Sequence, residues 1–311
     1  MRRLVVLLTL LAVAGCGGDE EPASAPSQRP VTVALDFVPN PVHAPIYLAD
    51  EAAVRIQTPG SGPDGLKLVT SGKVELGVLD IHDLAIARAA GTDVVAVGAL
   101  VGKPLAALVA QPDVARPRDL EGRTVGVSGL PSDPAFLKAI VEHDGGDVSK
   151  IKQVTIGFNA VSRLLTKRVD AVPVFWNAEG VALKQRGLKA NEFRVEEYGA
   201  PPYPEVVFFT SRETLAAERP RVEAALDAIA AGLDAARANP EKAVDVIAKA
   251  AETDDRELVR AQLDAVLPIF ADGLKLDRAV LEQWADFDAE IGLVEERPDV
   301  ERAFDFSVRG E

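Results

Sequence analysis

Short apolar segments alternate with amphipathic ones along most of this chain, and this alternation limits the folds that it can adopt. Residues 31–35, 74–79 and 93–100 are rich in valine and leucine, which is typical of buried strands. Helical segments that stop at glycine lie between several of them. Strands that alternate with helices form βαβ units, so the sequence predicts an α/β fold built on largely parallel sheets.

Two proline-containing segments divide the alternation into two lobes. Residues 111–120 (QPDVARPRDL) and 199–204 (GAPPYP) do not suit a regular element. We expect both to cross between lobes, so residues 31–112 and 206–311 form the first lobe and residues 113–205 form a second lobe inserted in it. The chain after residue 211 is alanine-rich and amphipathic, which predicts a helical C-terminal tail on the first lobe. A small ligand is expected in the cleft between the lobes.

The first 30 residues predict a targeting segment followed by a tether. Arg2 and Arg3 precede the apolar residues 4–13, a run that is shorter than the about 20 residues needed to span a membrane. Val-Ala-Gly then precedes Cys16, which resembles the bacterial lipobox. We therefore expect residues 1–15 to be a lipoprotein signal peptide, Cys16 to carry a lipid, and residues 16–30 to be a flexible tether.

Net charge and cysteine content narrow the class of protein further. The net charge is −14, and removing Arg2 and Arg3 leaves 32 basic against 48 acidic residues, or −16. This charge opposes nucleic acid and anionic membrane surfaces. Cys16 is the only cysteine, so an intrachain disulfide is excluded and, if Cys16 is acylated, so is thiol catalysis. We expect an extracytoplasmic monomer that is held to the bacterial cell membrane by its lipid anchor alone.

Residues 35–49 (LDFVPNPVHAPIYLA) connect the first predicted strand to a helix, the kind of junction at which open α/β sheets bind ligands. Asn40 before Pro41 suits an N-cap followed by the first helical position. The candidate ligand contacts of this segment are Phe37, Asn40, His43 and Tyr47. Core packing would explain Phe37 and Tyr47 equally well. A capping role without ligand contact would explain Asn40 equally well.

A second group of candidates follows the predicted strand at residues 171–175. Glu179 can accept hydrogen bonds from the amine edge of an aminopyrimidine, or it can simply favour a helix N-terminus. Trp176 can stack on a flat heterocycle or cap the lobe. Tyr203, near the predicted return crossing, can close over a ligand or fill the hinge.

Two further candidates come from the first lobe. Ser61 lies in a Pro-Gly-Ser-Gly turn whose backbone N–H groups suit a ligand oxygen or anion, although the turn lacks the lysine of a phosphate loop. His82 follows a predicted strand end and can donate to a ligand. A metal site is not expected, because His43 and His82 have no evident third ligand and Asp80 is explained as an N-cap. No cofactor is expected either.

Several segments together resemble one family of proteins. They are LDFVPNPVHAPIYLAD from residue 35, LVTSGKVELGV from residue 68, IHDLAIARAAG from residue 81, RDLEGRTVGV from residue 118 and FWNAEG from residue 175. They resemble the substrate-binding lipoproteins of ABC importers, in the branch that binds thiamine-pyrimidine precursors. That branch is related to sulfonate- and nitrate-binding proteins and to the fungal pyrimidine synthase of thiamine biosynthesis. The resemblance covers nearly all of residues 31–270.

The resemblance implies a two-lobe periplasmic-binding-protein fold of the type II kind, with an ABC permease and its ATPase as partners. This sequence departs from the pattern of the branch at Phe37, where a tryptophan is usual, and after Asp50, where a longer segment is usual. The implied function is capture of a small N-heterocycle, most simply a thiamine-pyrimidine precursor. A sulfonate, another small anion or a flavin-like ring is the alternative ligand, and a ligand sensor without a permease is a further alternative.

A pyrimidine-synthesising enzyme is the remote alternative. His82 matches the histidine that donates pyrimidine atoms in the fungal synthase. However, residues 77–80 (GVLD) lack the lysine that holds pyridoxal phosphate in that enzyme, and the region around Tyr203 lacks its cysteines. We therefore expect a protein that is not an enzyme and has no catalytic residues.

Overall fold

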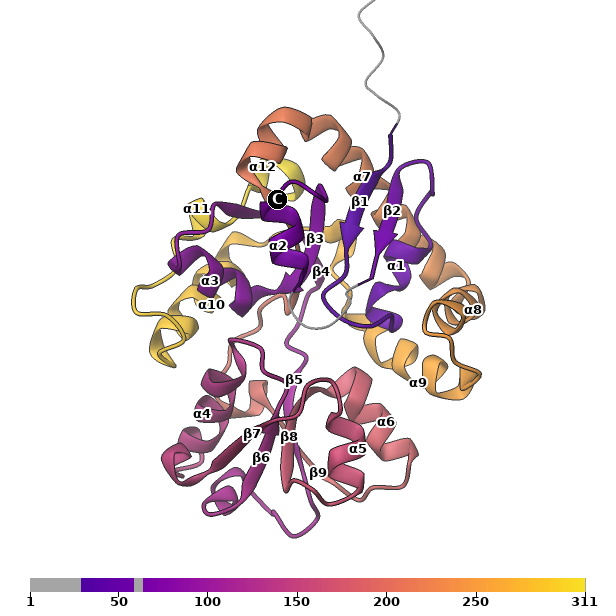
Figure 1. Cartoon of the computed structure of the whole chain (residues 1–311). Helices are drawn as coiled ribbons and strands as arrows, with labels where there is room; N and C mark the ends of the chain where they lie inside the picture. The colour runs from indigo at the N-terminus through magenta and orange to yellow at the C-terminus, as the bar shows by residue number, and fades with distance from the viewer. Residues whose placement is uncertain (1–28, 59–63, 311) are drawn as a thin grey trace, which may run out of the picture.

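The computed structural model describes residues 29–58 and 64–310. The expected signal peptide, Cys16 and Ser61 lie outside the described residues. Two lobes, each built around a five-stranded sheet, lie one above the other in Figure 1, with the first lobe at the top. The sheets have the strand orders β2-β1-β3-β10-β4 and β7-β6-β8-β5-β9, and helices cover both. The structure therefore has the predicted α/β fold, with the second lobe inserted in the first.

The strands of the first lobe are β1 (Val31–Ala34), β2 (Val54–Gln57), β3 (Leu76–Asp80), β4 (Val94–Val101) and β10 (Val206–Ser211). Those of the second lobe are β5 (Ala106–Ala110), β6 (Thr124–Val127), β7 (Lys152–Thr155), β8 (Ala171–Phe175) and β9 (Asn191–Arg194). Every residue of β3, β4 and β5 is buried, which explains their continuous apolar sequences.

Both sheets are mixed, which corrects the prediction of largely parallel sheets. β10 is antiparallel to β3 and β4, and β5 is antiparallel to β8 and β9. β5 and β10 are the first strands after each crossing between lobes. Each starts at the hinge and must run away from it, whereas β3 and β8 run toward the cleft.

The first crossing comes earlier than the sequence predicts. β5 belongs to the second sheet, so the chain leaves the first lobe between residues 101 and 106 rather than at residues 111–120. This corrects the expected boundary at residue 112. Residues 111–120 instead hold a turn and the 3-10 helix Pro117–Leu120 inside the second lobe. The apolar run over β4 and β5 hides the crossing, which is marked only by Gly102 and Pro104.

Long helices make up most of the C-terminal half of the first lobe. They are α7 (Arg212–Ala238), α8 (Pro240–Ala250), α9 (Arg256–Val266) and α10 (Arg278–Glu290). α7 lies so close to α1 (Ala44–Tyr47) that a Cβ at Gly232 would approach the Pro45 carbonyl oxygen to 2.1 Å. The short helices α11 (Val300–Ala303) and α12 (Phe306–Arg309) then pack on β4.

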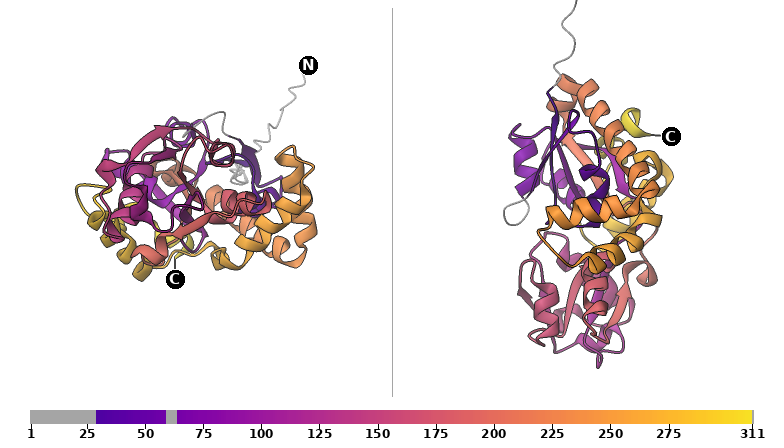
Figure 2. Two further views of the ribbon diagram at one scale, coloured as in Figure 1. Left: turned by 90° about the horizontal axis from the view of Figure 1, so that it is seen from below. Right: turned by 90° about the vertical axis from the view of Figure 1, so that its right-hand side faces the viewer.

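The tail also reaches the second lobe, which the sequence does not predict. α9 packs against α6 (Val181–Gln185), and the Gln262 side chain donates to the Ala178 carbonyl over 2.9 Å. The views in Figure 2 show the C-terminal helices extending from the first lobe toward the second. The remaining helices are α2 (Asp64–Thr70), α3 (Ile81–Ala89), α4 (Asp133–His143) and α5 (Ala160–Leu165).

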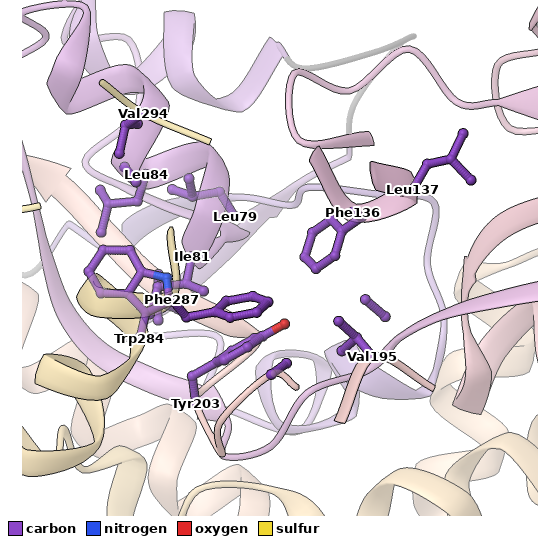
Figure 3. Close-up of a cluster of buried hydrophobic side chains, with 14 of the residues drawn as sticks. Leu79, Ile81, Leu84, Phe136, Leu137, Val195, Tyr203, Trp284, Phe287 and Val294 are labelled. Atoms are coloured by element: carbon purple, nitrogen blue, oxygen red, sulfur yellow. The ribbon is translucent and has the colours of Figure 1, made fainter. Parts of the chain in front are cut away.

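The hydrophobic core continues through the hinge. Tyr203, Phe287 and Trp284 are buried side by side with Ile81 and Leu84 of α3, while Phe136 of α4 faces them from the second lobe (Figure 3). The two lobes are therefore joined by packing as well as by the two crossing segments. In the part of the chain that the structure describes, no helix has both the length and the apolar character needed to cross a membrane.

Candidate functional site

A cavity of about 410 Å³ lies between the two lobes. Its first-lobe wall comes from the turn after β1, the start of α2 and the β3–α3 junction. Its second-lobe wall comes from the loop after β6, the start of α4, the loop after β7 and the end of β8. Most of the lining is apolar, with Leu66, Leu79, Leu108, Phe136, Val174 and Phe175 among the contributing side chains.

The turn after β1 is held together by Asn40 and His43. The Asn40 side chain accepts a hydrogen bond from the backbone N–H of Val42 over 2.9 Å, so it acts as the expected N-cap. The backbone N–H of Asn40 donates to Nδ1 of His43 over 3.3 Å. Nε2 of His43 then faces Oδ1 of Asp36 at 2.8 Å. Because Nδ1 accepts a hydrogen bond, Nε2 carries the ring proton and donates a hydrogen bond to Asp36.

His43 is fully buried, and both of its ring nitrogens are used within this turn. It lines the cavity with its ring, but the hydrogen bonds fix the direction of Asp36. Asp36 is the group of this pair that has an oxygen left for a ligand. The sequence therefore finds the right turn but misses its carboxylate.

Glu179 lies on the opposite lobe. β8 ends at Phe175, and Trp176–Gly180 form a wide π-helical turn that directs the Glu179 carboxylate back to the Phe175 N–H, 3.3 Å away. Burial raises the pKa of Glu179 above its ordinary value, and hydrogen bonds from the backbone N–H groups of Glu179 and Phe175 offset part of this shift. A carboxylate in this position needs hydrogen-bond donors, and a ligand in the cavity is placed to supply them.

Three more carboxylates line the cavity: Asp80 and Asp83 from the first lobe and Asp133 from the second. Asp133 is satisfied internally, since it accepts from the Ser128 hydroxyl and from the backbone N–H groups of Gly129 and Leu130. Burial raises the pKa of Asp83 to about 6, although hydrogen bonding from Ser132 and the charge of His82 act against the shift. Oδ1 of Asp83 has no hydrogen-bond partner among the described residues.

The cavity is therefore apolar with an acidic lining. Asp36, Asp80, Asp83, Asp133 and Glu179 line it, against a single lysine, Lys67. Such a lining favours a ligand that is flat or apolar in its body and rich in hydrogen-bond donors or positive charge at its edges. It opposes a ligand that brings its own negative charge.

Phe37 and Phe158 close one part of this cavity from opposite lobes. Phe37 follows β1 and Phe158 follows β7, and their rings meet edge to face with the centroids 4.3 Å apart. Phe158 is 36% exposed, so only part of its surface is covered by this contact. The two rings provide part of the aromatic surface of the site, to which Phe136 and Phe175 also contribute.

The structure places four of the predicted site residues away from the cavity lining. Tyr47, the last residue of α1, packs partly buried against the hydrophobic core of the first lobe. Nε1 of Trp176 donates to the Pro104 carbonyl over 3.1 Å, and the Arg194 guanidinium lies 4.0 Å over its ring. His82 and Tyr203 are fully buried in the hinge core, their rings 4.7 Å apart. Phe37, Asn40, His43 and Glu179 do line the cavity.

Comparison with known proteins identifies the family. A model of the family described as "NMT1/THI5 like" matches residues 40–243, about two thirds of the chain. The chain belongs to the NMT1/THI5-like family. A formylaminopyrimidine-binding protein from Halalkalibacterium halodurans is 32% identical over 258 residues, which are 78% of this chain and 76% of that protein.

Other members of the family and its structural neighbours differ in activity. A 4-amino-5-hydroxymethyl-2-methylpyrimidine phosphate synthase from Candida albicans is 24% identical over 239 residues, 70% of each chain. The periplasmic aliphatic sulphonate-binding protein SsuA of Escherichia coli has a similar fold. It matches with a TM-score of 0.73 at 17% identity, over 91% of this chain and 99% of that one. These neighbours confirm the periplasmic-binding-protein fold.

Several residues that line this NMT1/THI5-like site are not among the predicted ligand contacts, including Asp36, Asp80, Asp83, Asp133 and Phe158. Asp36 directly follows a predicted strand, and Asp83 and Asp133 lie in the first turns of helices that follow strands. A carboxylate directly after a strand or in the first turn of the next helix is therefore the sequence signal by which these three residues could have been found. A carboxylate at a helix start suits the helix dipole with or without a ligand, so this position alone does not identify a ligand contact. Phe158 gave no signal, because an isolated aromatic in a loop matches no motif.

Proposed function

We propose that this chain is an extracytoplasmic solute-binding protein of an ABC importer, and that it captures a thiamine-pyrimidine precursor. The observation that carries the proposal is the acidic lining of an otherwise apolar interlobe cavity, with Glu179 and Asp36 on opposite lobes. The similarity to a formylaminopyrimidine-binding protein supports the same class of ligand.

An aminopyrimidine matches these features group by group. Its ring is flat and suits the Phe37 and Phe158 surface. Its exocyclic NH₂ lies beside a basic ring nitrogen, and a carboxylate accepts from both when the ring is protonated. Glu179 is the carboxylate to which we assign this role, because backbone N–H groups hold it at the cavity wall and a ligand in the cavity can supply further donors. Asp36 would accept from a donor at the other side of the ring.

A sulfonate or other small anion is less well suited. Sulfonate-binding neighbours share the fold at 17% identity, but an anion here would face five carboxylates and one lysine. The enzyme alternative is also disfavoured. His82 lies behind the cavity wall with Nδ1 bonded to Asp288, and no lysine stands at residues 77–80.

The remaining parts of the proposal concern where the protein acts. Cleavage before Cys16 and acylation of its sulfur would anchor the protein to the outer face of the cell membrane, with an ABC permease and its ATPase as partners. The mature chain would act as a monomer. Mass spectrometry of the protein purified from membranes tests the anchor, and Cys16→Ala should release the protein in an unlipidated form.

Calorimetric titration tests the ligand. The mature protein is titrated separately with an aminopyrimidine, a flavin and an alkanesulfonate. We expect the aminopyrimidine to bind, and Glu179→Gln to weaken that binding by more than about 1 kcal/mol through loss of a charge-assisted hydrogen bond. The matched control is Glu192→Gln, since Glu192 pairs with Lys184 and Arg194 and does not line the cavity. Sulfonate binding that is retained or strengthened in Glu179→Gln would contradict the proposal that the ligand is a thiamine-pyrimidine precursor.

A further inference from the structure

A second polar cluster lies at the hinge, behind the wall of the ligand cavity. It consists of Asp80 at the end of β3, His82 at the start of α3 and Glu205 directly before β10. One ligand-type atom from each of the three side chains lies within 4.8 Å of the others. His82 and Glu205 are fully buried and Asp80 is 8% exposed.

In each of the three side chains, one polar atom is held by the protein. Nδ1 of His82 bonds to Oδ1 of the buried Asp288 over 2.6 Å. Oδ1 of Asp80 accepts the His82 N–H over 2.7 Å. Oε2 of Glu205 accepts the N–H groups of Leu105 and Ala106, the latter over 3.0 Å.

A second polar atom of His82 and of Glu205 is left for another partner. Nε2 of His82 and Oε1 of Glu205 are buried without a hydrogen-bond partner among the described residues. A histidine whose Nδ1 is fixed by a carboxylate presents Nε2 in the way that metal-binding histidines do. The Tyr203 ring lies against that of His82, and its hydroxyl also has no hydrogen-bond partner in the described part of the chain. Figure 3 shows the Tyr203 side chain in the hinge core.

The charges of this cluster are also unbalanced. Asp80, Glu205 and Asp288 form three buried carboxylates, and His82 is the one basic side chain against them; in the described part of the chain no lysine or arginine pairs with them. Buried charges need pairing or metal coordination. A carboxylate oxygen of Asp80 lies within 4.8 Å of one of Glu205, so two negative charges would face each other here unless a proton or a cation lies between them.

We propose that Asp80, His82 and Glu205 form a binding site for a divalent transition-metal ion such as Zn²⁺. One imidazole nitrogen and two carboxylate oxygens are ligands that suit this class of ion. Asp288 orients His82, and the N–H groups of Leu105 and Ala106 orient Glu205. Asp80 also lines the ligand cavity, which gives the ion its path of entry.

The site would join three segments of the hinge. Glu205 stands on the return crossing, its Oε2 bonds to the end of the first crossing, and Asp80 and His82 belong to the first lobe. A bound ion would therefore fix both crossing segments to the first lobe. The site does not depend on which ligand the interlobe cavity takes.

Metal titration of the full mature chain tests the site. The protein is stripped with a chelator and titrated with Zn²⁺ by calorimetry, and its thermal unfolding is followed with and without Zn²⁺. We expect one saturable site and a higher Tm with the ion, because binding to the folded state alone stabilises it. Glu205→Gln should weaken Zn²⁺ binding at least about tenfold, while its amide can still accept from Leu105 and donate to Asp80.

Two further variants complete the test. Asp80→Asn keeps the acceptor for the His82 N–H and should also weaken Zn²⁺ at least about tenfold, so it serves if Glu205→Gln does not fold. Asp264→Asn removes an exposed carboxylate of α9 and should leave the site unchanged, which controls for weak binding to this acidic surface. Absence of a saturable site, or wild-type binding in both Glu205→Gln and Asp80→Asn, would show that a shared proton holds the carboxylates together.

Discussion

Phe37 of the first lobe and Phe158 of the second meet edge to face, with their ring centroids 4.3 Å apart and their planes inclined at 68°. The two rings come from loops that follow β1 and β7, so they touch only while the lobes are closed. Both also line the ligand cavity. Their contact therefore links closure of the lobes to retention of the ligand.

Phe158→Ala should speed ligand release. An aromatic pair contributes about 0.5–1.5 kcal/mol beyond area burial, so we expect affinity to fall by that amount, chiefly through a faster dissociation rate. Stopped-flow fluorescence measures this rate. Val38→Ala is the matched control, because Val38 is 48% exposed beside Phe37 and does not line the cavity. An unchanged dissociation rate in Phe158→Ala would separate the aromatic contact from closure.

Ligand affinity should depend on pH through Glu179. Its carboxylate form accepts hydrogen bonds from the ligand, and its pKa is raised by burial. The contribution of the Glu179 carboxylate to affinity is therefore lost as the pH drops through its raised pKa, at a higher pH than an ordinary glutamate would give. Calorimetry across the acidic range compares the wild type with Glu179→Gln, in which this component should vanish. Identical pH profiles for the two proteins would exclude Glu179 as the titrating group.

The same group should lower the stability of the protein without ligand. The folded pKa of Glu179 lies above its unfolded value, so the folded state holds the proton more tightly, and stability rises as the pH falls between these two values. At neutral pH, Glu179→Gln should raise the free energy of unfolding by about 0.5–1 kcal/mol, or roughly 2 °C in Tm. Scanning calorimetry at neutral and acidic pH measures both effects. A lower Tm at neutral pH would mean that Glu179 holds the fold together rather than serving a ligand.

Trp176 should matter to stability more than to ligand binding. Its ring lies under Arg194, and its N–H reaches the Pro104 carbonyl on the first crossing. Trp176→Phe keeps an aromatic ring and removes the hydrogen bond, so we expect a loss of about 0.5–1.5 kcal/mol in urea unfolding. Ligand affinity should stay within roughly twofold. A fall in affinity with unchanged stability would instead support a ligand contact by Trp176, one of the two roles that the sequence left open.

The fold could largely be predicted from the sequence because its signals are local. The apolar runs of β3, β4 and β8 and the glycines after helices mark elements within a few residues of their observed bounds. The direction of β5 and β10 could not be predicted in this way, because it depends on where each strand starts relative to the hinge. The unbroken apolar sequence through β4 and β5 likewise gives no sign that the two strands lie in different sheets.

The site was predicted only in part, for a related reason. Asn40 and Glu179 could be found because a strand end and a helix start are readable in sequence. Asp36 could not be separated from His43, since the hydrogen bond between them decides which group faces the ligand. Glu205 lies 125 residues after Asp80, and only the folded chain brings the two together.

The position of β10 has a consequence for how the protein is made. β10 lies between β3 and β4 in the first sheet, yet it follows the whole second lobe in sequence. The first lobe therefore lacks a central strand until residues 206–211 have been synthesised, whereas the second sheet is complete by residue 194. Since domains fold as units during synthesis, we expect the inserted lobe to reach its native structure before the lobe that encloses it.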